Sequence, residues 1–115
     1  MSITVYGIPN CDTVKKARAF LAEHGLVHAF HDYKTQGVPQ EALRHWVAEL
    51  GWEPLLNRQG TTWRKLSAER QSAVHDAASA IALMIEQPSV IRRPVLVSDR
   101  RLLVGFKPDQ WSELR

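Results

Sequence analysis

The sequence predicts an α/β protein with a mixed four-stranded sheet, flanking helices, and a helical lobe inserted between two β regions. Three observations predict this fold class. An apolar run, a helical apolar pattern and an alternating run follow one another in residues 2–33. Residues 39–87 then carry apolar side chains at helical spacing. Finally, only residues 98–101 separate two short apolar runs near the C-terminus, which is typical of an antiparallel hairpin.

The N-terminal segment is expected to form two strands joined by a helix. Residues 2–6 are a short apolar run and predict a buried strand. Residues 13–24 carry apolar side chains at helical spacing, and Gly25 suits the left-handed position that follows a helix. Residues 27–33 alternate between apolar and polar side chains and predict the second strand. Because a helix joins the two strands, they are expected to be parallel neighbours.

The helical lobe is expected from about residue 39 to residue 87. Pro39 opens its first helix, at a position where proline is common, and Gly51 ends it. Four side chains recur on one face of this helix: Leu43, Trp46, Val47 and Leu50.

Two further helices are expected in the lobe, capped by Ser67 and Asp76. Pro88 stops the last of them, whose inward face is expected to hold Ala77, Ile81, Met84 and Ile85. The segments around these helices are expected to be polar loops at 34–37 and 57–62 and a short helical turn at 52–56.

The C-terminal segment is expected to complete the sheet. Residues 95–97 and 102–104 form the hairpin, and Pro108 begins a last helix that turns Trp111 and Leu114 to one side. The element order β-α-β, helices, β-β-α is the thioredoxin-like arrangement with an insertion. We therefore expect residues 1–115 to be a single domain.

Composition limits the class of protein. A chain of 115 residues has the size of one domain, and 44% hydrophobic with 23% charged residues is typical of a soluble globular protein. No apolar run is long enough to span a membrane, and we expect no signal peptide, because the sequence shows no basic start followed by an apolar core. A single cysteine excludes an internal disulfide, which favours the cytoplasm.

Charge limits the partners. The net charge is +3, and the basic residues are scattered along the chain without a nucleic-acid-binding motif. We therefore rank anionic small molecules above DNA or RNA, and expect no membrane partner.

The single cysteine, Cys11, lies in a turn between the first strand and the first helix. A thiol at a helix N-terminus faces unpaired backbone N–H groups and the positive end of the helix dipole, which favour the thiolate. Most single cysteines are instead small buried hydrophobes. The neighbours Asn10, Asp12 and Thr13 suit a solvated turn better than a core, so a reactive thiol is the better interpretation. The Asp12 carboxylate would oppose thiolate formation, weakly if water screens it.

Other residue patterns carry less chemistry. His24, His28 and His31 are spaced like ligands, but Gly25 interrupts them, and we expect surface histidines and no metal. No glycine-rich phosphate loop is present. The Arg93-Pro94 pair is more informative, since a proline opening a strand opposite the cysteine turn is where thioredoxin-like folds carry a cis peptide bond. An ordinary trans proline is the alternative.

Four motifs now match a family, in order along the chain: residues 6–13, 57–64, 91–97 and 105–108. They run YGIPNCDT, NRQGTTWR, IRRPVLV and GFKP. With them the chain resembles the arsenate-reductase-like (ArsC) family of thioredoxin-fold proteins, which includes the Spx regulators. It is most similar to the YffB-like branch, small bacterial proteins taken to be glutathione-dependent thiol reductases. The resemblance covers essentially the whole chain.

The resemblance implies roles for several residues. The nucleophilic cysteine falls on Cys11, the anion-binding arginine on Arg93, and the cis proline on Pro94. A second arginine of the arsenate reductases falls on Lys107, which keeps the charge but not the planar donor pair. Another falls loosely near Arg58. The second cysteine that Spx regulators often carry falls on the position of Val14, so the two-cysteine switch is absent.

The leading hypothesis is a glutathione-dependent thiol–disulfide reductase with Cys11 as its single nucleophile. Glutathione would be a co-substrate that resolves the mixed disulfide, held by Arg58, Arg93, Pro94 and Lys107, and no cofactor would be bound. The partners would be glutathione and a small oxidised or disulfide substrate, with the protein a monomer. The first alternative is arsenate reduction at Cys11. The second is a non-enzymatic, Spx-like regulator that binds RNA polymerase.

Overall fold

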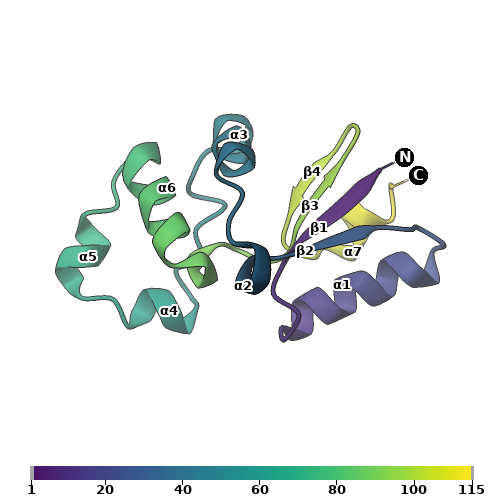
Figure 1. Cartoon of the computed structure of the whole chain (residues 1–115), viewed down its shortest axis with the longest axis horizontal. Coiled ribbons are helices and arrows are strands. Elements are labelled where there is room, and N and C mark those ends of the chain that lie inside the picture. Colours follow the sequence, from purple (N-terminus) through teal and green to yellow (C-terminus); the bar gives the residue numbers. More distant parts are fainter. Residues whose placement is uncertain (1, 115) are drawn as a thin grey trace. The chain divides into compact units, whose positions relative to one another are not determined.

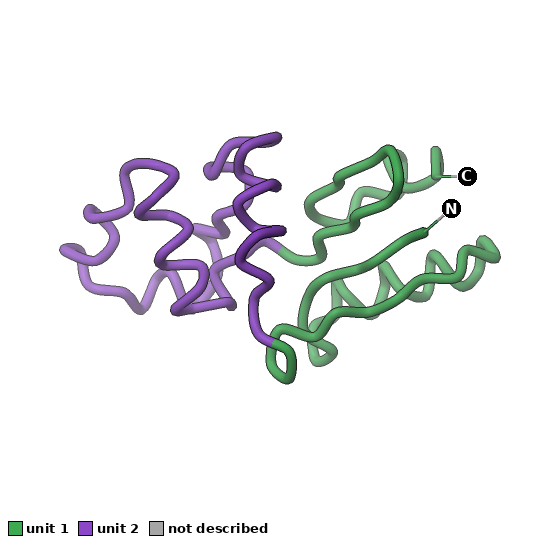
Figure 2. The backbone as a smooth tube through the Cα atoms, turned by 45° about the horizontal axis from the view of Figure 1, so that its top comes forward, with its two compact units in different colours: residues 1–36, 93–115 green, residues 37–92 purple. Residues whose placement is uncertain are grey.

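The computed structural model describes residues 2–114. The chain divides into two compact units, Met1–Gln36 with Arg93–Arg115, and Gly37–Arg92 (Figure 2). The first unit is therefore built from both ends of the chain, and the second from the segment between them.

The first unit holds a mixed four-stranded sheet (Figure 1). Its order is β2-β1-β3-β4, with β1 parallel to β2 and the other neighbours antiparallel. The predicted mixed sheet and C-terminal hairpin are confirmed. The elements of this unit are β1 (Ile3–Gly7), α1 (Asp12–Glu23), β2 (Ala29–Asp32), α2 (Tyr33–Gln36), β3 (Val95–Ser98), β4 (Leu102–Val104) and α7 (Pro108–Trp111).

Helices α1 and α7 share one hydrophobic core with the sheet. In β1 burial is deepest at every second residue, because successive side chains of a strand point to opposite faces. Helix α1 buries residues at helical spacing, and Trp111 of α7 is fully buried. The buried members of this cluster are Ile3, Val5, Ala17, Leu21, Leu96, Leu103, Trp111 and Leu114.

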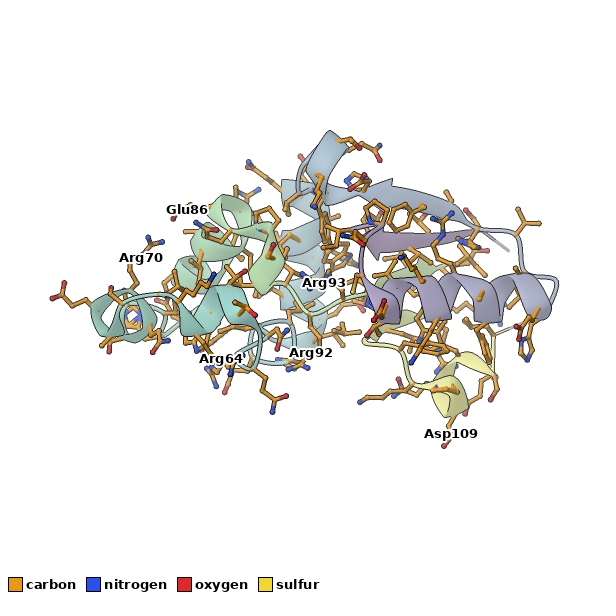
Figure 3. All side chains as sticks on the ribbon, turned by 90° about the horizontal axis from the view of Figure 1, so that it is seen from below. Arg64, Arg70, Glu86, Arg92, Arg93 and Asp109 are labelled. Carbon is orange, nitrogen blue, oxygen red and sulfur yellow. The ribbon has the colours of Figure 1, made fainter. Side chains whose placement is uncertain are left out.

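The second unit is helical. Its elements are α3 (Gln40–Leu50), α4 (Thr61–Arg64), α5 (Ala68–Ser72), α6 (Ala77–Glu86) and the 3₁₀ helix η1 (Pro88–Val90). Helices α3 and α6 pack together. Their buried residues are Leu43, Trp46 and Val47 on α3 and Ala80, Leu83 and Met84 on α6. Leu56 and Ile91 form an isolated antiparallel bridge. On the unit's surface, Arg70 and Glu86 form an ion pair at 2.8 Å (Figure 3).

Two expected loops are wrong because each contains a single helical turn. Residues 33–36 form α2, where the Asp32 carboxylate accepts a hydrogen bond from the Lys34 amide at 2.8 Å. Residues 61–64 form α4, closed by Arg64 N–H donating to Gly60 at 3.2 Å. At 52–56, where a short helical turn is expected, the structure has two successive hydrogen-bonded turns. Helices α2 and α4 were not expected because four residues are too few for an apolar period to show.

Two expected apolar faces and one strand also need correction. The inward face of α6 is rotated from the expected one: Ala77 is exposed, whereas Ala80 and Leu83 are buried. Leu50, at the end of α3, is 37% exposed because the helix stops there. The second strand is 29–32 rather than 27–33.

Among residues 2–114, no helix has the length and apolar character needed to cross a bilayer.

Candidate active site

The strand register brings three segments to one edge of the sheet. Parallel strands β1 and β2 end opposite each other, with Gly7 paired to Asp32. Antiparallel β3 begins at this same edge, because its first residue, Val95, pairs with Tyr6. The cysteine turn after β1, the first residue after β2 and the Arg93-Pro94 pair before β3 therefore lie at one edge.

Cys11 stands at the start of α1. It is the N-cap residue, with an extended backbone (φ −142°, ψ 123°), and its carbonyl accepts the first helical hydrogen bond from Lys15 at 2.9 Å. An N-cap residue faces amide N–H groups of the first turn that have no partner in the helix. The thiol is partly exposed, so a reagent can reach it.

The pKa of Cys11 is lower than that of an ordinary thiol. Burial raises it, but hydrogen bonds from the Val14 amide and the Arg93 side chain, the Arg93 charge and the Thr13 amide together outweigh that effect. These donors favour the thiolate because each interacts more strongly with a negative sulfur. The direction of this shift agrees with the expectation that the helix N-terminus favours the thiolate.

Arg93 and its neighbour Arg92 serve different partners. Arg93 lies at the N-terminal end of α1 and bonds the Cys11 thiol (Figure 3). Arg92 belongs to the second unit, where its Nε donates to the Pro54 carbonyl at 3.1 Å. The Arg93-Pro94 bond is cis, as expected, and Pro94 is buried, with its carbonyl accepting a hydrogen bond from Gly105 at 2.8 Å.

The two other predicted binding residues are not brought to the thiol by any of these contacts. Lys107 is exposed at the N-cap of α7 and is not among the described groups that shift the Cys11 pKa. Asp12 is not among them either. Arg58 lies in the second unit, with its guanidinium 5.5 Å from the centre of the Trp52 ring. The roles proposed for Lys107 and Arg58 stay predictions.

Tyr33 is a polar residue of this edge that sequence reasoning missed. It is only 3% exposed, and its hydroxyl has no hydrogen-bond partner among the described residues. Its ring meets His31 edge-on at 6.0 Å, and His31 lies 5.0 Å from the ring of Tyr6. Burial raises its pKa well above the ordinary range, so the phenol stays protonated. Its position as the first residue after a parallel strand was a usable signal, since ligands bind at that edge of α/β sheets.

The three spaced histidines serve local contacts. His24 bonds the Phe20 carbonyl at 2.8 Å, Arg18 donates to His28 at 3.2 Å, and His31 packs against tyrosines. Within residues 2–114, no three His, Cys, Asp or Glu side chains lie close enough together to hold a metal ion.

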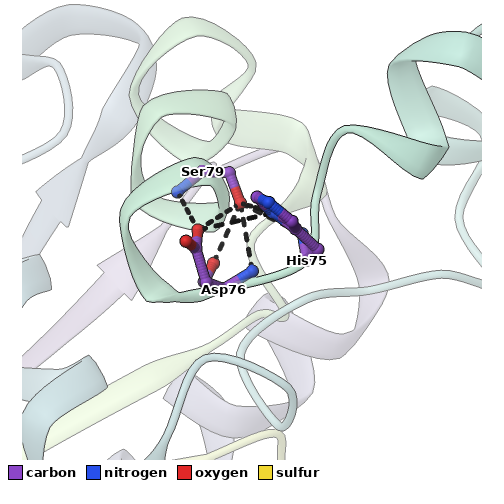
Figure 4. Close-up of polar contacts among 3 residues, drawn as sticks. All are labelled: His75, Asp76 and Ser79. Carbon is purple, nitrogen blue, oxygen red and sulfur yellow. Dashed lines mark hydrogen bonds and ion pairs between the residues drawn. The ribbon is translucent and has the colours of Figure 1, made fainter.

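A Ser-His-Asp cluster at the start of α6 is a helix cap (Figure 4). The Asp76 carboxylate accepts from both the amide of Ser79 at 2.9 Å and its hydroxyl at 2.6 Å. His75 Nδ1 lies 3.7 Å from the Asp76 carboxylate and 3.3 Å from the Ser79 hydroxyl, but the Ser79 hydroxyl bonds the carboxylate directly, whereas in a catalytic triad the imidazole stands between acid and hydroxyl. The Ser79 hydroxyl accepts from the His75 amide at 3.0 Å, so its bonds close the helix end.

The fold and the thiol site define a thioredoxin-like protein with a low-pKa cysteine at the start of its first helix. The chain belongs to the ArsC family, whose model matches residues 6–114. Both the recognised family and the fold class are therefore confirmed.

Three similar proteins illustrate the family. A YffB protein of known structure is 53% identical, with 96% of each chain covered and a TM-score of 0.91. An arsenate reductase (ArsC) related protein from Brucella melitensis is 54% identical, with 97% of this chain and 92% of that chain covered and a TM-score of 0.77. The global transcriptional regulator Spx from Streptococcus pneumoniae is 28% identical over 94% of this chain and 81% of its own.

Proposed function

We propose that the protein is a glutathione-dependent thiol–disulfide reductase whose single nucleophile is Cys11. The observation that carries the proposal is the lowered pKa of this thiol, set by two helix amides and Arg93. A lowered thiol pKa increases the fraction of thiolate at a given pH, and the thiolate is the form that attacks a disulfide.

The reaction has two exchanges. The Cys11 thiolate attacks one sulfur of a disulfide, so that a mixed disulfide forms and the other sulfur leaves as a thiolate. The thiolate of glutathione then attacks the mixed disulfide and returns Cys11 to its thiolate form. Two electrons pass from two glutathione molecules to the substrate when a second glutathione reduces the resulting glutathione mixed disulfide. Because the chain has one cysteine, a second thiol must come from outside.

Arg93 has two tasks in this proposal. Its charge stabilises the Cys11 thiolate, and its guanidinium binds a glutathione carboxylate, which suits its forked donors. Pro94 beside it would contact the glutathione peptide. Lys107 and Arg58 would add positive charge for the other carboxylate. No bound cofactor takes part.

The test is turnover of a small disulfide by purified protein with glutathione, coupled to NADPH oxidation through glutathione reductase. Wild-type protein should catalyse the reaction, and its mass after exposure to oxidised glutathione should rise by one glutathione. Cys11→Ser should lose both and keep its melting temperature. Wild-type protein that shows neither turnover nor the adduct would overturn the proposal.

A second candidate function is regulation by binding RNA polymerase, as the notable similarity to Spx over 94% of the chain favours. It needs no turnover, and Val14 stands where Spx regulators often carry their second cysteine. A pull-down of purified RNA polymerase distinguishes the two functions: retention by the Cys11→Ser variant as well as the wild type would support the regulator.

A further inference from the structure

The hydroxyl of Tyr33 needs a partner that the described residues do not supply. A buried hydroxyl without a hydrogen-bond partner is destabilising, and Tyr33 is only 3% exposed. The neighbouring ring of His31 meets it edge-on, so packing alone would be served equally by phenylalanine.

Tyr33 lies within electrostatic reach of Arg93, the residue that bonds the Cys11 thiol. Arg93 lowers the pKa of Tyr33 against the larger effect of burial, which raises it. The same arginine lowers the pKa of Cys11. The sheet register explains this closeness, because Tyr33 directly follows Asp32, which pairs with the last residue of β1. Thiol, guanidinium and phenol therefore line one edge of the first unit.

We propose that Tyr33 is a specificity-determining residue that donates a hydrogen bond to an anionic oxygen of the ligand held by Arg93 beside Cys11. The ligand chemistry is a carboxylate or a tetrahedral oxyanion. This inference rests on the proposed function only in taking that ligand to be a substrate of Cys11. The donor is suited to the task because a phenol with a raised pKa stays protonated and so offers a proton and no negative charge.

The test compares two alkylating reagents at Cys11. Iodoacetate carries a carboxylate and iodoacetamide does not, so the ratio of their rates reports how well an anion is held beside the thiolate. Tyr33→Phe should lower this ratio about tenfold, as expected for one lost hydrogen bond to a charged group. It should leave the iodoacetamide rate unchanged. Protection of Cys11 by sulfate tests the tetrahedral oxyanion in the same way.

The matched control is Tyr6→Phe, which removes the other phenol of the cluster. Burial raises the Tyr6 pKa, and Tyr6 in turn raises the pKa of Tyr33, but Tyr6 is not among the groups that shift the pKa of Cys11. The ratio and the sulfate protection should therefore not change. If Tyr33→Phe changes neither the ratio nor the protection, the inference is overturned. A loss of either supports it and identifies the class of anion.

A second measurement observes Tyr33 without replacing it. The chain has two tyrosines, so 3-fluorotyrosine labelling gives two fluorine NMR signals, assigned with Tyr6→Phe. Acetate or sulfate should shift the Tyr33 signal and not that of Tyr6, whereas no shift with either anion contradicts the inference. These readouts do not involve glutathione, so a protein that lacks reductase turnover but shows them retains the anion site and loses only the proposed reaction.

Discussion

At the residue scale, the reactivity of Cys11 depends on donors from two segments far apart in the chain. The amides of Thr13 and Val14 follow it directly, whereas Arg93 arrives just before β3. The local donors come with any helix that starts at this cysteine. The arginine reaches the thiol because the register of β1 and β3 brings it to the same sheet edge.

Arg93→Ala should therefore raise the Cys11 pKa, because it removes both a hydrogen bond and a positive charge from the thiolate. The pH dependence of iodoacetamide labelling measures this pKa. Arg92→Ala is the matched control, since Arg92 bonds the Pro54 carbonyl in the second unit. Equal pKa values for Arg93→Ala and the wild type would contradict the site described here.

Arsenate should be a poor substrate compared with a small disulfide. Lysine at position 107 lacks the paired donors of arginine, which should cost oxyanion affinity by ~1–3 kcal/mol. Lys107→Arg should raise arsenate kcat/KM by about tenfold and leave disulfide exchange unchanged. The rate of arsenite formation in the presence of glutathione measures arsenate turnover. Wild-type arsenate turnover as fast as disulfide turnover would favour arsenate reduction over the proposed reaction.

The site residues that could be predicted from the sequence are those with a local sequence pattern around them. Cys11 was identifiable because a lone cysteine stood between a strand and a helix, and the Arg93-Pro94 pair because a proline opened a strand. Tyr33 was assigned to the strand itself, so its place beyond the strand end was missed. Its lack of a hydroxyl partner is a property of the packed structure, which no spacing of residues records.

At the element scale, the junction of β1 and α1 is set by a close approach. A Cβ added at Gly7 would meet a methyl carbon of Val14 at 3.0 Å, and Val14 is fully buried. Glycine thus lets the strand end lie against the helix turn whose amides face the thiol.

Gly7→Ala should destabilise the protein by about 1–3 kcal/mol through overpacking. It should also raise the Cys11 pKa, because displacing Val14 weakens the bond from its amide to the sulfur. Thermal melting and labelling against pH measure the two effects. Gly25→Ala is the control: its φ of +69° with open space around it predicts a cost of about 1–2 kcal/mol with no change in thiol pKa. If folded Gly7→Ala keeps the wild-type pKa of Cys11, Val14 has not moved.

The cap of α6 predicts a pH dependence of stability. Hydrogen bonds from Ser79 hold the Asp76 pKa below its usual range. The folded pKa is depressed, so this stabilisation is complete above the ordinary carboxyl pKa of about 4. It is lost as the pH falls through the lower folded value. Asp76→Ala should lower the melting temperature at pH 7. The difference in melting temperature between this variant and the wild type should become smaller in acid.

Asp76→Asn separates the cap from its charge. Asparagine is also a good N-cap residue, so this variant should keep most of the melting temperature at pH 7 and lose the acid dependence that Asp76 contributes. If Asp76→Ala melts at the wild-type temperature at pH 7, the capping box does not stabilise α6.

The elements themselves were predictable in proportion to their length. Helices α1, α3 and α6 repeat an apolar pattern over several turns, and the caps Ser67 and Asp76 were read correctly. The single turns α2 and α4 were not, because contacts such as Asp32 with Lys34 decide them. Even in α6 the exact face was misjudged, since almost every residue there is apolar and the period alone does not choose among them.

At the scale of the whole molecule, the first unit is discontinuous and the second is continuous. Strand β3 must return to pair with β1 after the chain has passed through all of Gly37–Arg92. Closing a flexible loop costs entropy that grows with its length, by about 0.6 kcal/mol for each doubling. A folded second unit replaces that flexible loop, and the C-terminal end of this unit is held within it, where Arg92 N–H bonds the Leu55 carbonyl at 2.7 Å and Leu56 bridges Ile91.

We therefore expect the two units to unfold in one transition, as a single domain would. In urea, the indole N–H signals of Trp111 in the first unit and Trp46 in the second should disappear with the same midpoint. Met84→Ala, at a fully buried position of α6, should cost about 2–5 kcal/mol and lower both midpoints together. Val27→Ala changes a side chain that is 89% exposed and should move neither. The units would be independent domains if the Trp111 and Trp46 signals disappear at different urea concentrations. The same conclusion would follow if Met84→Ala lowers the midpoint of Trp46 alone.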